Sequence, residues 1–131
     1  MEKKIHVISS LKSKTNQYAL FIGRWQPLHS SHIALFNEAL NEGKNVCIAI
    51  RDVEVSENNP FKAEDIKANI EEQFALLVNT GRVKVIIIPD IHSVEFGRGV
   101  GYDIIEHIPP TEIAEVSATK VREQMRIDGK L

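Results

Sequence analysis

The sequence is poor in cysteine, because Cys47 is the only one among its 131 residues. A single thiol has no partner in the chain for a disulfide and cannot build a cysteine metal cluster. Cys47 stands in the apolar run NVCIAI, so we expect its thiol to be buried and unreactive.

The sequence also lacks a long apolar run and a strong charge bias. No segment approaches the roughly 18 to 20 apolar residues of a membrane span, and the first residues, MEKKIHVISSLKSK, contain no apolar signal core. We therefore expect an intracellular, cytoplasmic protein without membrane contact. The formal net charge is only −2, so the composition does not predict a nucleic-acid partner.

Strand and helix patterns alternate through the first two thirds of the chain. Short apolar runs predict strands, apolar residues at spacings of three and four predict helices, and glycines follow two of the helices. The predicted order is strand 18–23, helix 31–43, strand 45–52, helix 63–81 and strand 82–90. This order predicts an α/β fold with a Rossmann-like, doubly wound parallel sheet. We treat residues 1–131 as a single domain, with 1–17 as an N-terminal extension to which the sequence assigns no role.

The last third is less regular. A short strand is predicted at 93–96, before a glycine cluster, and another at 111–116. A helix is predicted at 117–129, with Ser117 as its N-cap.

One stretch does not fit simple packing. The sequence FIGRWQPLHSSHIALF leads from the first strand into the first helix and carries Arg24, His29 and His32. In parallel sheets, ligands bind beyond the carboxyl ends of the strands, where helix N-termini present free N–H groups. A guanidinium and two imidazoles at this place favour a phosphate-binding site.

A second cationic group stands at an equivalent junction near the end of the chain. Hydroxyls and cations alternate there in Ser117, Thr119, Lys120 and Arg122. The same donors can hold a polyphosphate from its other side.

Together, GRWQPLHSSH and VSATKVRE resemble the paired T/H-x-G-H and I-S-x-T-x-x-R/K motifs of a nucleotidyltransferase superfamily. The first motif and the piece NPF (59–61) are most similar to nicotinamide-mononucleotide adenylyltransferases, and SATK is also similar to glycerol-3-phosphate cytidylyltransferases. The resemblance implies the adenine nucleotide alpha hydrolase-like nucleotidyltransferase fold. It also implies transfer of a nucleoside monophosphate from a nucleoside triphosphate, ATP in preference to CTP, to a phosphorylated small molecule, with release of pyrophosphate.

The resemblance also assigns roles to residues. It implies that His29, His32, Lys120 and Arg122 are catalytic, and that nucleotide and phosphate contacts come from Gly23, Arg24, Trp25, Ser117 and Thr119. Asn59, Phe61 and Arg98 are weaker candidates for substrate contacts. Mg²⁺ is expected with the triphosphate, because it binds mainly through phosphates and water. Such relatives often form oligomers, which makes a homo-oligomer an expectation here.

Two alternative functions remain open, and a metal site has also to be considered. Ser31 stands where the motif has glycine, which suggests a nucleotide-binding or regulatory protein with weakened catalysis. A zinc site is not predicted, because no Glu lies between the two histidines, although His92 or His107 could approach them in space. The second alternative function is an α/β interaction domain, in which the histidines are exposed and far from Lys120 and Arg122.

Overall fold

The computed structural model describes residues 16–99, 101–107 and 118–131. The N-terminal extension up to residue 15, the predicted strand 111–116 and Ser117 lie outside the described residues. Among the described residues, no helix combines the length and apolar character needed to cross a membrane.

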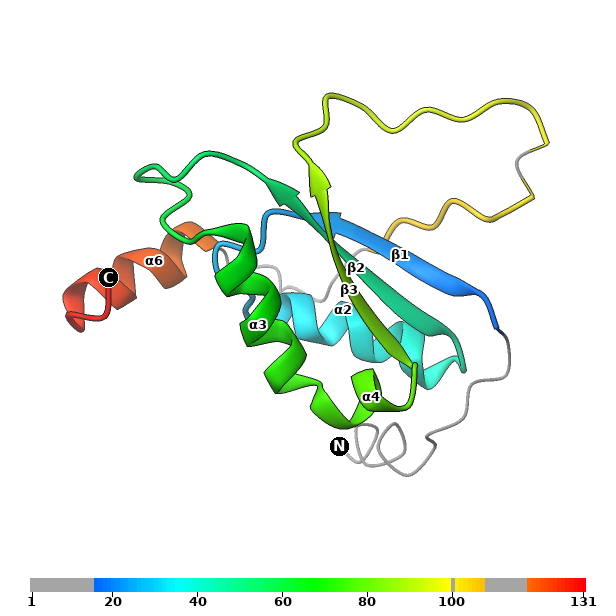
Figure 1. The fold of residues 1–131 in the computed structure, drawn as a ribbon, viewed down its shortest axis with the longest axis horizontal. Helices are drawn as coiled ribbons and strands as arrows, with labels where there is room; N and C mark the ends of the chain where they lie inside the picture. The colour runs from blue at the N-terminus through cyan, green and yellow to red at the C-terminus, as the bar shows by residue number, and fades with distance from the viewer. Residues whose placement is uncertain (1–15, 100, 108–117) are drawn as a thin grey trace.

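A three-stranded parallel sheet forms the centre of the described structure, with the order β1-β2-β3 (Figure 1). Its strands are β1 (Tyr18–Gly23), β2 (Asn45–Asp52) and β3 (Val83–Pro89). Gly23 pairs with Ile50 and Asp52 pairs with Pro89, so all three strands end at the same edge of the sheet. This carboxyl edge is where a ligand site is expected.

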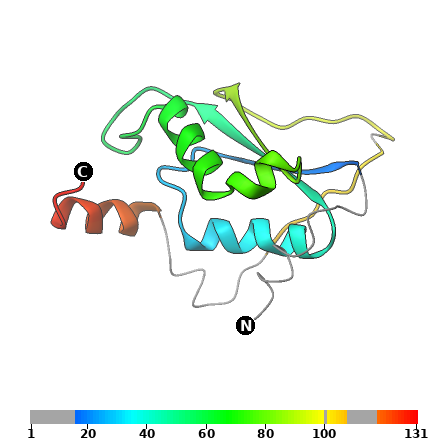
Figure 2. The same ribbon diagram turned by 60° about the horizontal axis from the view of Figure 1, so that its bottom comes forward.

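The helices between the strands are α2 (Ser30–Asn41), α3 (Ala63–Gln73) and the short α4 (Ala75–Asn79). All three lie on one side of the sheet (Figure 2). The last helix, α6 (Ala118–Ile127), lies apart from this layer, near the carboxyl end of β1 (Figure 1).

The core lies between the sheet and α2 and α3. Val46, Ile48 and Ile50 alternate along β2 and are fully buried, as the two-residue period of a strand requires when one face is covered. Phe36 of α2 and Ile70 of α3 are equally buried against them. The core therefore holds α2 and α3 against the sheet.

The α/β, Rossmann-like fold predicted from the sequence is confirmed, and β1 and β2 have the predicted bounds. The single helix predicted over 63–81 is instead two helices. Phe74, which has φ −113° and ψ 29°, interrupts them while its ring packs 6.2 Å from that of Phe36. Tertiary packing thus overrides a continuous helical pattern.

The strand predicted at 93–96 is wrong. The described residues of the segment 91–107 contain neither helix nor strand, and Val94 and Phe96 are exposed. The alternating pattern of Ser93 to Phe96 is not sufficient for a strand, because an extended segment needs a partner for its backbone hydrogen bonds and a face to bury. Cys47 is also less buried than predicted, although burial still raises the pKa of its thiol, which favours the unreactive form.

Candidate functional site

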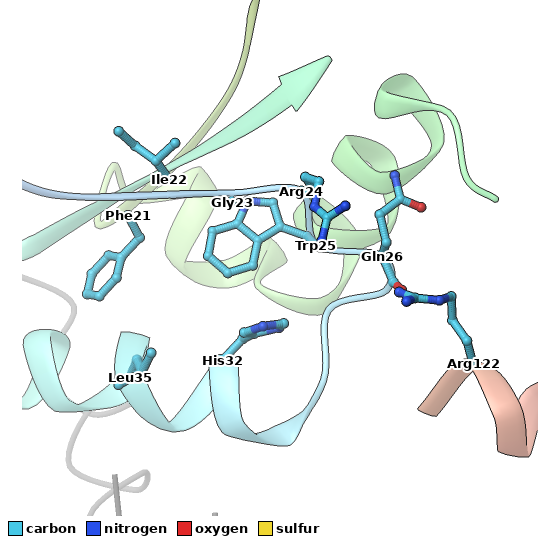
Figure 3. Close-up of a pocket in the computed structure, with 9 residues that line it drawn as sticks. All are labelled: Phe21, Ile22, Gly23, Arg24, Trp25, Gln26, His32, Leu35 and Arg122. Carbon is cyan, nitrogen blue, oxygen red and sulfur yellow. The ribbon is translucent and has the colours of Figure 1, made fainter. Parts of the chain in front are cut away.

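A cleft of about 350 Å³ opens at the carboxyl end of β1, between this strand, α2 and α6 (Figure 3). Both apolar and polar side chains line this cleft. The lining residues are Phe21, Ile22, Gly23, Arg24, Trp25, Gln26, His32, Leu35 and Arg122. No carboxylate is among these described residues, and Arg24, His32 and Arg122 supply donors that suit an anion.

Gly23 and Trp25 shape the wall of the cleft where β1 ends. A Cβ atom on Gly23 would lie 2.9 Å from the Trp25 ring, closer than real Cβ atoms approach. The indole is buried and its Nε1–H donates to the carbonyl of Ala49 at 3.0 Å. The glycine therefore allows the close approach of the indole, and Trp25 is a packing residue of the wall rather than a free stacking surface.

His29 and His32 stand together at the N-terminus of α2. Their rings are stacked, with centroids 3.7 Å apart and an interplanar angle of 24°. Nδ1 of His32 accepts a hydrogen bond from the backbone N–H of His29 at 3.1 Å, and the His32 ring also meets Trp25 edge to face at 4.8 Å. Because Nδ1 is an acceptor, neutral His32 carries its proton on Nε2. That nitrogen is then a donor.

Both imidazoles are held in the neutral form. Burial, together with the neighbouring His29, lowers the pKa of His32 to about 4, and burial lowers the pKa of His29 as well. Protonation of both stacked rings would place two positive charges side by side, and partial burial disfavours the charged form of each imidazole. An anion in the cleft would act against this bias, since a nearby negative charge favours the charged form of an imidazole.

Gln26 connects three distant segments around the cleft. Its buried amide donates to the carbonyl of Phe61 and accepts from the N–H of Phe61, both at 3.0 Å. Its own backbone carbonyl accepts a 2.7 Å hydrogen bond from Nη1 of Arg122. The residue thus joins the β1–α2 loop to the segment before α3 and to α6, which places Arg122 beside the cleft (Figure 3).

Guanidinium groups gather at this junction. Arg122 is buried, and burial together with the positive charges of Arg24 and Arg126 lowers its pKa. Arg24 donates to the side chain of Asn59 at 3.1 Å, and Arg126 donates to the carbonyl of Glu57 at 2.8 Å. Like charges brought this close repel one another. An anionic ligand would relieve that repulsion.

The structure brings together most of the predicted site residues. Five of them line one cleft: Gly23, Arg24, Trp25, His32 and Arg122. The ring of His29 stacks on that of His32. Thr119 lies one helical turn before Arg122 and is 3.4 Å from Nη2 of that residue. Asn59 is tied to Arg24.

Other predicted residues lie elsewhere. Lys120 is exposed on α6 and is not among the residues that line the cleft, and Arg98 is an exposed residue of the segment that follows β3. Phe61 packs against the hydrophobic core and reaches the site only through its backbone. Its ring is therefore a packing group in this structure.

The zinc alternative finds no ligand set in the described part of the chain. No group of three or more His, Cys, Asp or Glu side chains there could hold a metal ion. His107 instead stacks on Phe21 at 5.8 Å and lies 3.2 Å from a carboxylate oxygen of Glu38.

Sequence reasoning missed Gln26 and underestimated Ser31. The role of Gln26 depends on a contact with Phe61, 35 residues away, that no local pattern reveals. The one available signal was a polar residue between Trp25 and Pro27, since a buried amide needs partners. Ser31 lies 2.7 Å from Nδ1 of His29, so it belongs to the histidine pair.

Replacement of Gln26 by leucine keeps the side-chain volume but removes both bonds to Phe61. The partly buried N–H and C=O groups of Phe61 then lose their partner, and we expect a loss of about 2 to 4 kcal/mol in the free energy of unfolding. Denaturant titration measures this loss. Gln73→Leu, at an exposed position of α3, is the control and should change stability by less than about 0.5 kcal/mol. Equal effects of the two substitutions would contradict the assigned role of Gln26.

His32 also predicts a pH dependence of stability. Its pKa is about 4 in the folded protein and near 6.5 when unfolded, so the unfolded chain binds the proton first as the pH falls. The neutral His32 imidazole therefore contributes fully to the free energy of unfolding above about pH 6.5, and this contribution is lost progressively as the pH falls toward 4. In His32→Asn, an amide oxygen replaces Nδ1 as the acceptor but does not titrate. We expect the melting temperature of this variant to fall less between pH 7.5 and pH 5 than that of the wild type.

The control is His92→Asn, which removes an exposed imidazole and should retain the wild-type pH profile. Parallel profiles for wild type and His32→Asn would mean that the His32 imidazole is not held in its neutral form.

Comparison with known proteins gives two curated relatives, whereas no family model and no solved structure matches. The chain is 32% identical over 78 residues to the nicotinamide/nicotinic acid mononucleotide adenylyltransferase of Acinetobacter baylyi, a match that covers 58% of this chain and 41% of the relative. It is 43% identical over 47 residues to the nicotinamide-nucleotide adenylyltransferase of Methanococcus aeolicus, covering 34% and 27%. The matched regions span less than half the length of each relative. The resemblance to nicotinamide-mononucleotide adenylyltransferases, expected from the two motifs, is confirmed.

Proposed function

We propose that the protein is a nucleotidyltransferase of the adenylyltransferase type. In this proposal it transfers the AMP moiety of ATP to a phosphate-bearing small molecule and releases pyrophosphate. The names of the two relatives support the reaction class and favour ATP over CTP. They also support a nicotinamide mononucleotide as the first acceptor to test.

One observation carries the proposal. His32 at the start of α2 and Arg122 on α6, 90 positions later in the sequence, line the same cleft at the carboxyl edge of the sheet. Helix N-termini attract phosphate through their free N–H groups and the helix dipole. A shared cleft also argues against the interaction-domain alternative, which requires these groups to lie far apart.

The reaction needs no nucleophile from the protein. An oxygen of the acceptor phosphate attacks the α-phosphorus of ATP in line, a new P–O bond forms, and the bond to the leaving pyrophosphate breaks. Catalysis then consists of positioning and of stabilising charge on the phosphate oxygens. We assign His32 and His29 as hydrogen-bond donors to the triphosphate, since neutral His32 carries its proton on Nε2.

The arginines complete the anion site. Nη1 and Nη2 of Arg122 already contact Gln26 and Thr119, and its remaining N–H groups are available to phosphate. Arg24, exposed at the mouth of the cleft, is assigned to the acceptor phosphate or to the triphosphate tail. Thr119, Ser117 and Lys120 are assigned to the outer phosphates and the leaving pyrophosphate. The described lining residues include no carboxylate, so in this proposal Mg²⁺ enters with the nucleotide, held by phosphates and water.

Thermal stabilisation by nucleotides tests the proposal without knowledge of the acceptor. ATP with Mg²⁺ at ten times its dissociation constant should stabilise the folded protein by about 1.4 kcal/mol, which raises the melting temperature by several degrees. CTP should give a smaller shift. His32→Asn should weaken the ATP shift, because the variant lacks the Nε2 donor, whereas His92→Asn should retain it.

Pyrophosphate release then separates an enzyme from a binding protein. With ATP and nicotinamide mononucleotide, the wild type should release pyrophosphate, and His32→Asn should be about 100- to 1,000-fold slower. ATP binding without pyrophosphate release from any phosphorylated acceptor would favour the weakened nucleotide-binding protein. Absence of any shift with millimolar ATP or CTP would overturn the proposed function.

A further inference from the structure

Ser31 holds a special position in the first turn of α2. Its Oγ lies 2.7 Å from Nδ1 of His29, a short distance for a hydroxyl–nitrogen hydrogen bond. The side chain is partly buried, whereas the neighbouring Ser30 is exposed. The hydroxyl is therefore engaged with the imidazole of the histidine pair.

The two imidazoles are thus anchored in parallel ways. Nδ1 of His32 accepts the backbone N–H of His29, and Nδ1 of His29 lies against the Ser31 hydroxyl. A hydroxyl can donate or accept, so the tautomer of His29 decides which group donates. If Nδ1 of His29 carried the proton, its Nε2 would present a lone pair, which repels the oxygens of an anion.

We propose that Ser31 is a positioning residue, which donates its hydroxyl proton to Nδ1 of His29 and so keeps the Nε2–H of that ring available to a phosphate group. Both stacked histidines then carry their proton on Nε2, which makes that nitrogen a donor in each ring. The link to phosphate rests on the proposed function, whereas the link between Ser31 and the His29 tautomer does not.

The geometry favours this direction of donation. Serine hydroxyls inside helices commonly donate to the carbonyl four residues earlier. Ser31 is the second residue of α2, so the residue four positions earlier, Pro27, lies outside the helix. The group that lies within hydrogen-bond distance of the Ser31 hydroxyl is instead Nδ1 of His29, at 2.7 Å.

Imidazole ¹⁵N NMR of the free protein at pH 8 tests the first part. In the wild type, His29 should show a protonated Nε2 and an unprotonated Nδ1. In Ser31→Ala the two nitrogens should shift toward a mixture of tautomers, and Ser31→Thr, which restores a hydroxyl, should return them toward the wild-type values. Ser30→Ala, the matched control one residue earlier, should leave them unchanged.

ATP affinity tests the second part. Loss of one hydrogen bond of ordinary strength should raise the dissociation constant of ATP roughly 3- to 10-fold in Ser31→Ala. Ser31→Thr should recover part of the lost affinity, and Ser30→Ala should bind ATP as the wild type does. Circular dichroism should be the same for all four proteins.

The NMR spectra and the ATP affinities together show which part of the proposal is wrong if one of them fails. His29 spectra that are the same in wild type and Ser31→Ala, or a wild-type His29 protonated on Nδ1, would overturn the role of Ser31 whatever the ATP result. A tautomer shift in Ser31→Ala with unchanged ATP affinity would overturn its link to phosphate. A tautomer shift in a protein that binds no nucleotide would leave Ser31 as the positioning residue of His29 and overturn the proposed function.

Discussion

The site depends on the hydrogen bond from the Arg122 guanidinium to the backbone carbonyl of Gln26, which joins residues 96 positions apart at 2.7 Å. Both groups are buried, and a charged donor makes a strong bond where water is excluded. Through it, α6 lies beside the β1–α2 loop although it is separate from the helix layer on the sheet. Without this contact the cleft would have its imidazoles but not its buried guanidinium.

The other contacts of Gln26 explain why that carbonyl is held in place. Its amide makes two hydrogen bonds with the backbone of Phe61, and Trp25, the residue before it, is fixed by Ala49 of the central strand. The loop is therefore held from the sheet on one side and from the segment before α3 on the other. A loop fixed in this way can present charged and neutral donors with little loss of entropy on binding.

The fold was predictable where the sequence pattern is local and strong. β1, β2 and β3 are nearly continuous apolar runs, and α2 has a regular apolar face that ends before Gly43, which has a positive φ of 88°. The break at Phe74 was not predictable, because no helix-breaking residue stands there and the contact between Phe74 and Phe36 forms only in the fold. The strand predicted at 93–96 failed for the opposite reason, since its local pattern pairs with no strand among the described residues.

The candidate site was predictable in its imidazoles and guanidiniums, because their motif marks the carboxyl end of a strand. Gln26 and the Ser31 contact depend on atoms brought together by the fold, so composition and spacing did not reveal them. The same limit applies to Phe61, whose side chain proved to be part of the core and whose backbone serves the site.

A structure of the protein with Mg²⁺ and α,β-methylene ATP, in which the bond that would break is blocked, tests the central claim most directly. We expect the phosphates to lie in the cleft between α2 and α6, with oxygens within hydrogen-bond distance of Nε2 of His32 and of the Arg122 guanidinium. A nucleotide bound elsewhere, or phosphates beyond the reach of both side chains, would contradict the assignment of this cleft as the nucleotide site.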